Sequence, residues 1–148
     1  MDLDSTSAEW LKSNLFTIED DLTRALIWRC FYDGVRDGVL IKCTDFLDLA
    51  NQLMKKETNA YILETITNFY TQILFNYSPS EVSAIYQSRG FEVIRDILET
   101  TEDKEIAKLV KGLICRLASK PEEIEILKQW KEGTYAPFDH KEKKPSID

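Results

Sequence analysis

The chain has 148 residues, 43% of them hydrophobic and 11% aromatic, which is enough to bury the core of one domain. Its formal net charge of -7 counts against a nucleic-acid binder, which usually carries a basic face that neutralises phosphates. No apolar run approaches the ~20 residues that cross a bilayer, so no membrane span is expected.

Glycine and proline are scarce and fall between segments with helical apolar periodicity, so the chain reads as helices joined by short turns. A short first helix is expected from Thr6, whose hydroxyl forms a capping box with Glu9. The next helix is expected over residues 18–37, with Thr17 as its N-cap and Gly38 as its left-handed stop. Strand-like alternation is nearly absent, which predicts an all-α fold.

The segment 18–37 carries apolar residues around most of the helix circumference, which predicts a helix enclosed by neighbours on several sides. These residues are Ile18, Leu22, Leu26, Ile27, Trp28, Phe31, Tyr32 and Val35. Charges between them suit ion pairs one helical turn apart, Asp20 with Arg24 and Asp33 with both Arg29 and Arg36. Alternatively, one arginine of the set Arg24, Arg29 and Arg36 faces a ligand groove, because guanidinium binds carboxylate in a bidentate manner.

Five further helices are expected, near residues 44–54, 59–76, 79–98, 102–118 and 120–132. The third of these should break or kink at Gly90, and Gly112 in the fourth is expected to mark a close helix crossing. Gly133 ends the last helix. We therefore expect a helical domain over residues 1–133, followed by a mobile polar tail over 134–148.

Helix starts recur near residues 18, 59 and 102, each followed by a second helix near 44, 79 and 120. This spacing matches the ~40 to 47 residues of HEAT or armadillo units, although no residue signature repeats. The predicted architecture is a set of antiparallel helical hairpins stacked as a HEAT/armadillo-like solenoid.

Residues suited to metal or disulfide chemistry are few. Cys30, Cys43 and Cys115 are odd in number and widely spaced, which favours reduced thiols packed as small hydrophobes. A single histidine, His140, cannot assemble a multi-ligand zinc site, so no cofactor is expected in this chain. The start of the chain has neither a basic nor an apolar stretch, which predicts a cytoplasmic location.

Two motifs in succession carry a family resemblance. The first is Asp20-x-Leu22-x-Arg24-x-x-x-Trp28, which leads into Arg36-Asp37-Gly38; the second is Phe46-Leu47-x-Leu49. This pattern resembles the C-terminal helical domain of zinc aminopeptidases of the aminopeptidase N type, named for its likeness to the endoplasmic-reticulum aminopeptidases. The match is closest over residues 20–54 and continues more loosely, in helix order, to about Trp130.

The resemblance implies a non-catalytic lid and scaffold domain that encloses a peptide chamber. Its partners would be the catalytic domain of the same parent enzyme, which holds the zinc, and the peptide substrate. The family's zinc motif, His-Glu-x-x-His, is not in this sequence, so the chain is expected to be inactive alone. The family domain is about twice as long, which implies that the chain leaves an apolar end face of the solenoid uncapped.

Two other interpretations stay open. An independent HEAT-like interaction module, unrelated to peptidases, would bind a partner helix or peptide along its concave face. An enzyme complete in itself would need paired carboxylates, but Asp2 and Asp4, Asp20 and Asp21, and Glu122 and Glu123 lie where solvated helix starts explain them.

Overall fold

A computed structural model describes residues 3–134 of the chain. Within that range the fold is all-α, as predicted, with no strand. Its helices are α1 (Ser5–Asn14), α2 (Asp21–Asp37), α3 (Cys43–Leu53), α4 (Ala60–Asn76), α5 (Ser80–Thr100), α6 (Lys104–Leu117) and α7 (Pro121–Lys131), with a 3-10 turn at Leu15–Thr17. The chain divides into two compact units, Met1–Tyr86 and Gln87–Asp148, and the boundary falls inside α5. The predicted tail, apart from Thr134, lies outside the described residues.

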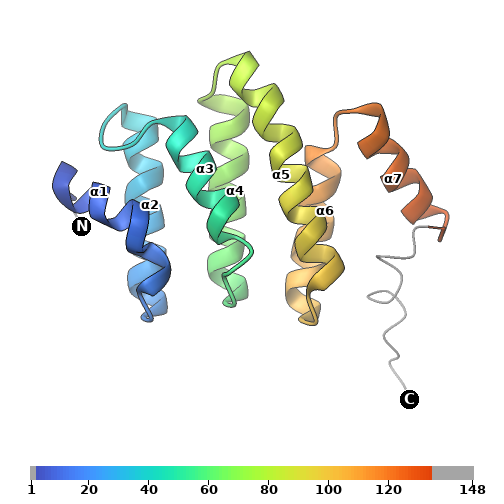
Figure 1. The fold of residues 1–148 in the computed structure, drawn as a ribbon, viewed down its shortest axis with the longest axis horizontal. Helices are drawn as coiled ribbons and strands as arrows, with labels where there is room; N and C mark the ends of the chain where they lie inside the picture. The colour runs from blue at the N-terminus through green and yellow to red at the C-terminus, as the bar shows by residue number, and fades with distance from the viewer. Residues whose placement is uncertain (1–2, 135–148) are drawn as a thin grey trace. The chain divides into compact units, whose positions relative to one another are not determined.

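The first unit has two helical layers, with α1 and α3 in front of α2 and α4 (Figure 1). Helices α2 and α4 run in the same direction and pack against each other, and α3 packs against both (Figure 1). Large side chains with less than 2% exposure fill the space between the layers: Trp28, Phe31, Phe46 and Tyr70. Aromatic rings therefore supply much of the buried apolar area that stabilises this unit.

Helices α2, α4 and α6 begin with the same device, an Asp or Asn side chain that accepts a backbone N–H of the first turn. The pairs are Asp20 with Thr23 at 2.8 Å, Asn59 with Ile62 at 3.1 Å, and Asp103 with Ile106 at 3.2 Å. These bonds satisfy donors that a helix start otherwise leaves without partners.

Two predicted caps are wrong. Thr17 lies in the 3-10 turn, and its hydroxyl donates to Asn14 O at 2.6 Å instead of capping α2. Thr6 lies inside α1, which is capped by Asp4, whose Oδ1 accepts Ser7 N–H at 2.7 Å. In both cases an ionised carboxylate close by takes the position, because it is a stronger acceptor than a hydroxyl and favours the helix N-terminus.

The C-terminus of α2 ends in the expected left-handed glycine. Gly38 has φ 74°, and the chain closes with a Schellman pattern in which Val39 N–H donates to Gly34 O at 2.8 Å and Gly38 N–H to Val35 O at 3.2 Å. A Cβ on Gly34 would lie 2.8 Å from Val39 O, so the returning chain requires a glycine there too. Leu40 follows with φ 68°, a left-handed conformation that is costly for a leucine.

In the second unit, α7 begins at Pro121, one residue after the predicted start at residue 120. The buried Glu123 accepts the backbone N–H groups of Ser119 and Lys120, both at 3.0 Å. Apolar side chains of α6 lie along one buried face: Ile106, Val110, Leu113 and Leu117.

A predicted helix break at Gly90 and a predicted close crossing at Gly112 are both wrong. Helix α5 is continuous through Gly90, because a helical glycine keeps its backbone hydrogen bonds and the buried Phe91 and Ile94 continue the apolar face beyond it. Gly112 is exposed, and a Cβ there would meet nothing within 4 Å, so it marks no close helix crossing.

Helix α2 is also less enclosed than its sequence indicates. Leu22 and Leu26 are 68% and 42% exposed, whereas Trp28 is 1% exposed. Leu22 and Leu26 lie on one side of α2 with Cys30 and Asp33, at intervals of about one turn, and we call this side the outer face of α2. Among residues 3–134, no helix is long and apolar enough to cross a bilayer.

Candidate functional site

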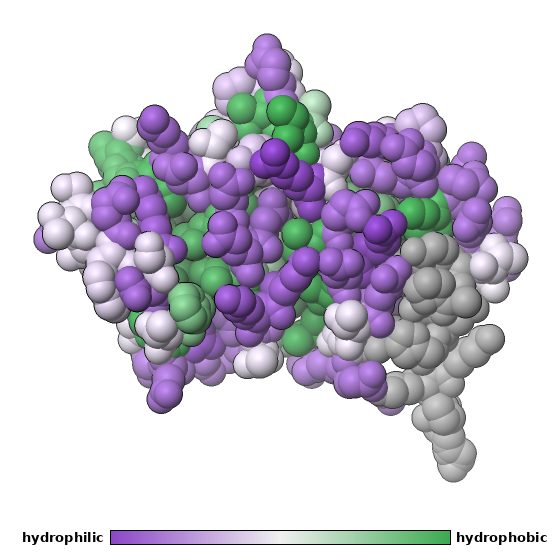
Figure 2. Space-filling view, viewed as in Figure 1, coloured by the Kyte–Doolittle hydropathy of each residue, from purple (hydrophilic) through white to green (hydrophobic). Residues whose placement is uncertain are grey.

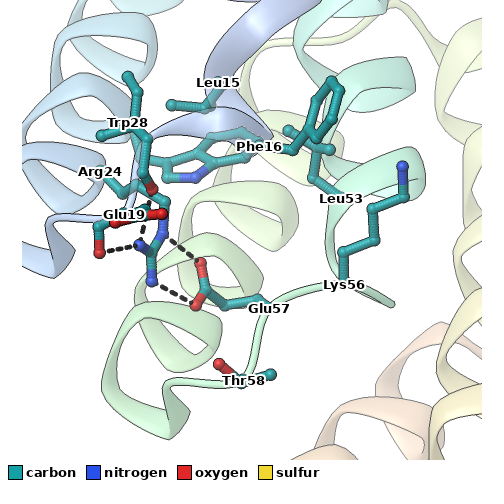
Figure 3. A pocket seen from close by; sticks show the side chains of 10 residues that line it. Leu15, Phe16, Glu19, Arg24, Trp28, Leu53, Lys56, Glu57 and Thr58 are labelled. Carbon is teal, nitrogen blue, oxygen red and sulfur yellow. Dashed lines mark hydrogen bonds and ion pairs between the residues drawn. The ribbon is translucent and has the colours of Figure 1, made fainter.

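The most extensive polar cluster of the first unit is built on Arg24, one of the arginines considered as a ligand contact. Its Nε and Nη2 donate to Glu57 Oε1 and Oε2 at 3.1 and 2.9 Å (Figure 3). Nη2 also donates to Asp21 at 2.5 Å. Nη1 donates to the carbonyl oxygens of Ile18 and Glu19 at 2.9 and 3.0 Å. All five N–H donors of the guanidinium are thus engaged, so none is left to bind a ligand carboxylate.

Burial and hydrogen bonds hold the side chains of this cluster in their charged forms as ion pairs. The side chains of Arg24 and Glu57 are 13% and 6% exposed. The bond to Glu57 raises the pKa of Arg24, while the bonds from Asn59 and Arg24 lower the pKa of Asp21. Glu57 Oε2 also accepts the backbone N–H of Asn59 at 3.1 Å. The cluster therefore ties the start of α2 to the start of α4.

A pocket of about 210 Å³ opens beside the ion pair. Its lining combines the buried Trp28 with the exposed Phe16, whose ring lies 4.7 Å from the Lys56 ammonium in a cation–π contact. Figure 3 shows Phe16 and Lys56 on the side opposite Arg24. The remaining lining residues are Leu15, Ile18, Glu19, Leu53 and Thr58.

The other two candidate arginines lie on the surface of α2. Arg29 and Arg36 have side chains 66% and 45% exposed and pair with Asp33 Oδ1 at 3.8 and 3.4 Å. The hydrogen bond that Arg36 donates to Asp37 raises the pKa of Arg36. Exposed pairs of this kind contribute little to stability.

Of the residues in the motifs between 20 and 49, Arg24, Trp28 and Phe46 occupy packing positions. The rings of Trp28 and Phe46 meet edge to face with centroids 5.4 Å apart, which joins α2 to α3. Gly38 ends α2, and Arg36 and Asp37 precede it on the surface. Leu22 is exposed. The motif residues thus lie at the start, the buried anchor and the end of one helix, and at the buried anchor of the next.

Sequence reasoning missed Glu57 and Asn59 as partners of the Arg24 cluster. The expected partner was Asp20, at i,i-4, but its carboxylate is committed to the N–H and hydroxyl of Thr23, at 2.8 and 2.5 Å. Hydrogen bonding to Thr23 accordingly lowers the pKa of Asp20. A separation of 33 residues between Arg24 and Glu57 gives no local signal.

Elements of a metal centre do not come together in residues 3–134, where no group of three or more His, Cys, Asp or Glu side chains is placed to hold an ion. Cys30 and Cys43 are half-buried and Cys115 is exposed. His140 lies outside the described residues. On most of the face drawn in Figure 2, hydrophilic side chains prevail, and hydrophobic ones show as separate spots.

Comparison with known proteins found no matching family model, no matching curated protein and no matching solved structure.

Proposed function

We propose that this chain is part of the non-catalytic C-terminal helical domain of a zinc aminopeptidase of the aminopeptidase N type. The observation that carries the proposal is the motif over residues 20–54, Asp20-x-Leu22-x-Arg24-x-x-x-Trp28 followed by Arg36-Asp37-Gly38 and Phe46. The role is supported by where those residues lie. Arg24, Trp28 and Phe46 hold helices together, and Gly38 closes a helix, which is what a scaffold signature requires.

In this proposal the helical pairs α2–α3 and α4–α5 belong to a HEAT-like solenoid. The domain packs on the catalytic domain of its parent, encloses the peptide chamber and limits which peptides enter. Shelter from bulk water strengthens the electrostatic interactions that a catalytic centre makes with its substrate. The zinc belongs to the catalytic domain, and residues 3–134 act in packing and not as metal ligands or proton-transfer groups.

The decisive experiment is to sequence the transcript that encodes the chain in both directions from its ends. We expect a reading frame that continues upstream and contains His-Glu-x-x-His with a downstream glutamate. A stop codon in frame before Met1, with no such motif encoded, would falsify the proposal.

A biochemical experiment addresses the same point in the native protein. Antibodies raised against the 148-residue chain should deplete a zinc-dependent activity on aminoacyl-naphthylamides from the source extract, and the depleted species should be much larger than this chain. The purified chain should show no turnover with or without zinc. Recovery of a species of this chain's size with a stable partner other than a peptidase would instead favour an independent HEAT-like interaction module.

A further inference from the structure

The outer face of α2 combines exposed apolar surface with a groove. Leu26 is 42% exposed in the middle of the helix. Beyond it, a groove of about 430 Å³ is lined by Cys30, Asp33 and Asp37 of α2 together with the apolar Leu3, Val39 and Leu40. Val39, at the rim, is 56% exposed. This side of the first unit therefore offers a concave surface of mixed apolar and acidic character.

The stacking of α4 on α2 indicates what such a face does. The ring of Phe69 in α4 stacks on Tyr32 of α2 with centroids 4.3 Å apart and planes 10° apart, and Gln72 Oε1 accepts the Tyr32 hydroxyl. Phe69 and Gln72 stand ten and thirteen positions after the N-cap Asn59 of α4. Cys30 and Asp33 stand ten and thirteen positions after the N-cap Asp20 of α2.

Because α2 and α4 run in the same direction and begin with the same capping device, equal positions after the cap lie on equivalent sides of the two helices (Figure 1). The outer face of α2 is thus the counterpart of the face with which α4 meets α2. Leu26 takes the place of the half-buried Thr65, whereas Leu22 takes the place of Tyr61, which stays 70% exposed in α4. Leu22 is accordingly at the rim of this face.

The carboxylate of Asp33 also indicates that a partner helix packs on this face. Its Oδ1 is buried and accepts no hydrogen bond from residues 3–134, although the guanidinium groups of Arg36 and Arg29 lie 3.4 and 3.8 Å away. The Asp33 side chain as a whole is 38% exposed. Gln72, at the same position of α4, receives a phenol hydroxyl, so Asp33 is placed to receive a hydroxyl or amide donor in the same way.

We propose that the outer face of α2 is the docking site for a further helical pair of the parent polypeptide. One helix of that pair runs parallel to α2, places an apolar or aromatic side chain over Leu26 and Cys30, and donates a hydrogen bond to Asp33. Its packing on α2 continues the interface that α2 makes with α4. The inference rests on the proposed function only in that the chain is part of a longer polypeptide; it requires no peptidase.

The test compares the 148-residue chain with the same chain extended upstream by about 90 encoded residues, the length of two HEAT-like repeats. Leu26→Glu should lower the thermal midpoint of the 148-residue chain by no more than about 2 °C, because 42% of the side chain is exposed there. In the extended chain it should lower the midpoint by about 5 °C or more, because a charge replaces a buried leucine. Leu22→Glu, with the same substitution at the rim, is the matched control and should be silent in both chains.

Alkylation of Cys30, followed by mass spectrometry of its peptide, provides a second readout that does not depend on a variant. The extension should slow modification of Cys30 by about tenfold or more and leave that of the exposed Cys115 unchanged. The proposal is overturned if Cys30 is alkylated at the same rate in the two chains, or if Leu26→Glu leaves the thermal midpoint of the extended chain unchanged.

Three remaining outcomes are equally informative. A gene without upstream helical sequence overturns the inference, and so does self-association of the 148-residue chain that Leu26→Glu abolishes, because the face then binds a second copy. Upstream helices without a zinc motif overturn the proposed function and leave the inference standing.

Discussion

The ion pair between Arg24 and Glu57 is the interaction whose removal should cost the first unit most. Glu57→Met leaves a guanidinium that is 13% exposed without its principal partner, and it removes an acceptor from Asn59 N–H. Removal of one partner of a buried pair costs about 3 to 5 kcal/mol. Since Arg24 keeps Asp21 and two carbonyl oxygens, we expect the lower end, about 3 kcal/mol.

The assay is urea denaturation followed by circular dichroism on five proteins: the wild type, Arg24→Met, Glu57→Met, the double variant and a control, Asp21→Asn. With a denaturant slope of about 2 kcal/mol per molar, each single substitution should lower the midpoint by roughly 1 to 1.5 M. The double variant should cost much less than the sum, because neither charge is then buried alone. Asp21→Asn, whose side chain is 58% exposed, is the control and should lower the urea midpoint much less than either single substitution. Single costs below about 1 kcal/mol, or additivity within about 0.5 kcal/mol, would refute the reasoning.

The remaining predictions concern helix termini, glycines and pH. Gly34→Ala should destabilise by about 1 to 3 kcal/mol because its Cβ meets Val39 O at 2.8 Å, whereas Gly112→Ala should stabilise by about 0.5 to 1 kcal/mol; equal signs in urea titrations contradict this. Glu123→Ala should cost about 2 kcal/mol, since two N–H groups lose their acceptor, and the exposed Glu125→Ala under about 0.5 kcal/mol; similar thermal midpoints for both variants count against the cap. Folded-state pKa values of Asp20 and Asp21 lie below the ordinary 3.8, so their contribution is present above that pH and is lost as the pH falls through the folded values. At pH values below about 4, the urea midpoint should therefore decrease, and the decrease should be less steep in Asp20→Asn. The same pH dependence in that variant and in the wild type would contradict the stabilising role of the Asp20 cap.

The elements that could be predicted from the sequence are those specified by local chemistry. Apolar periodicity and turn residues indicate each helix to within a few residues, and Gly38 marks the end of α2 because a glycine adopts the left-handed conformation without strain. Caps are less certain, since Thr17 and Asp20 compete for one helix start and the decision depends on which oxygen is the better acceptor.

What the sequence does not reveal is set by contacts between distant residues. Glu57 reaches Arg24 from 33 residues away, and Tyr86 donates its hydroxyl to Asp48 at 2.6 Å across 38 residues. The exposure of Leu22 and Leu26 likewise depends on which neighbours are present and not on the periodicity of α2. For the same reason, three arginines on one helix looked equivalent as ligand contacts, and only the fold separates the fully engaged Arg24 from Arg29 and Arg36 at the surface.

The placement of tryptophan gives the two units separate optical signals. Trp28, with 1% exposure in the first unit, should emit at short wavelength and shift to the red only when the α2–α3 packing opens. Trp130, half-buried in the second unit beside the Lys111 ammonium at 5.9 Å, should respond to loss of the α6–α7 contact. Once the exposed Trp10 is replaced by phenylalanine, variants that keep one of these two indoles would record the melting of each unit in the intact chain, without dividing α5.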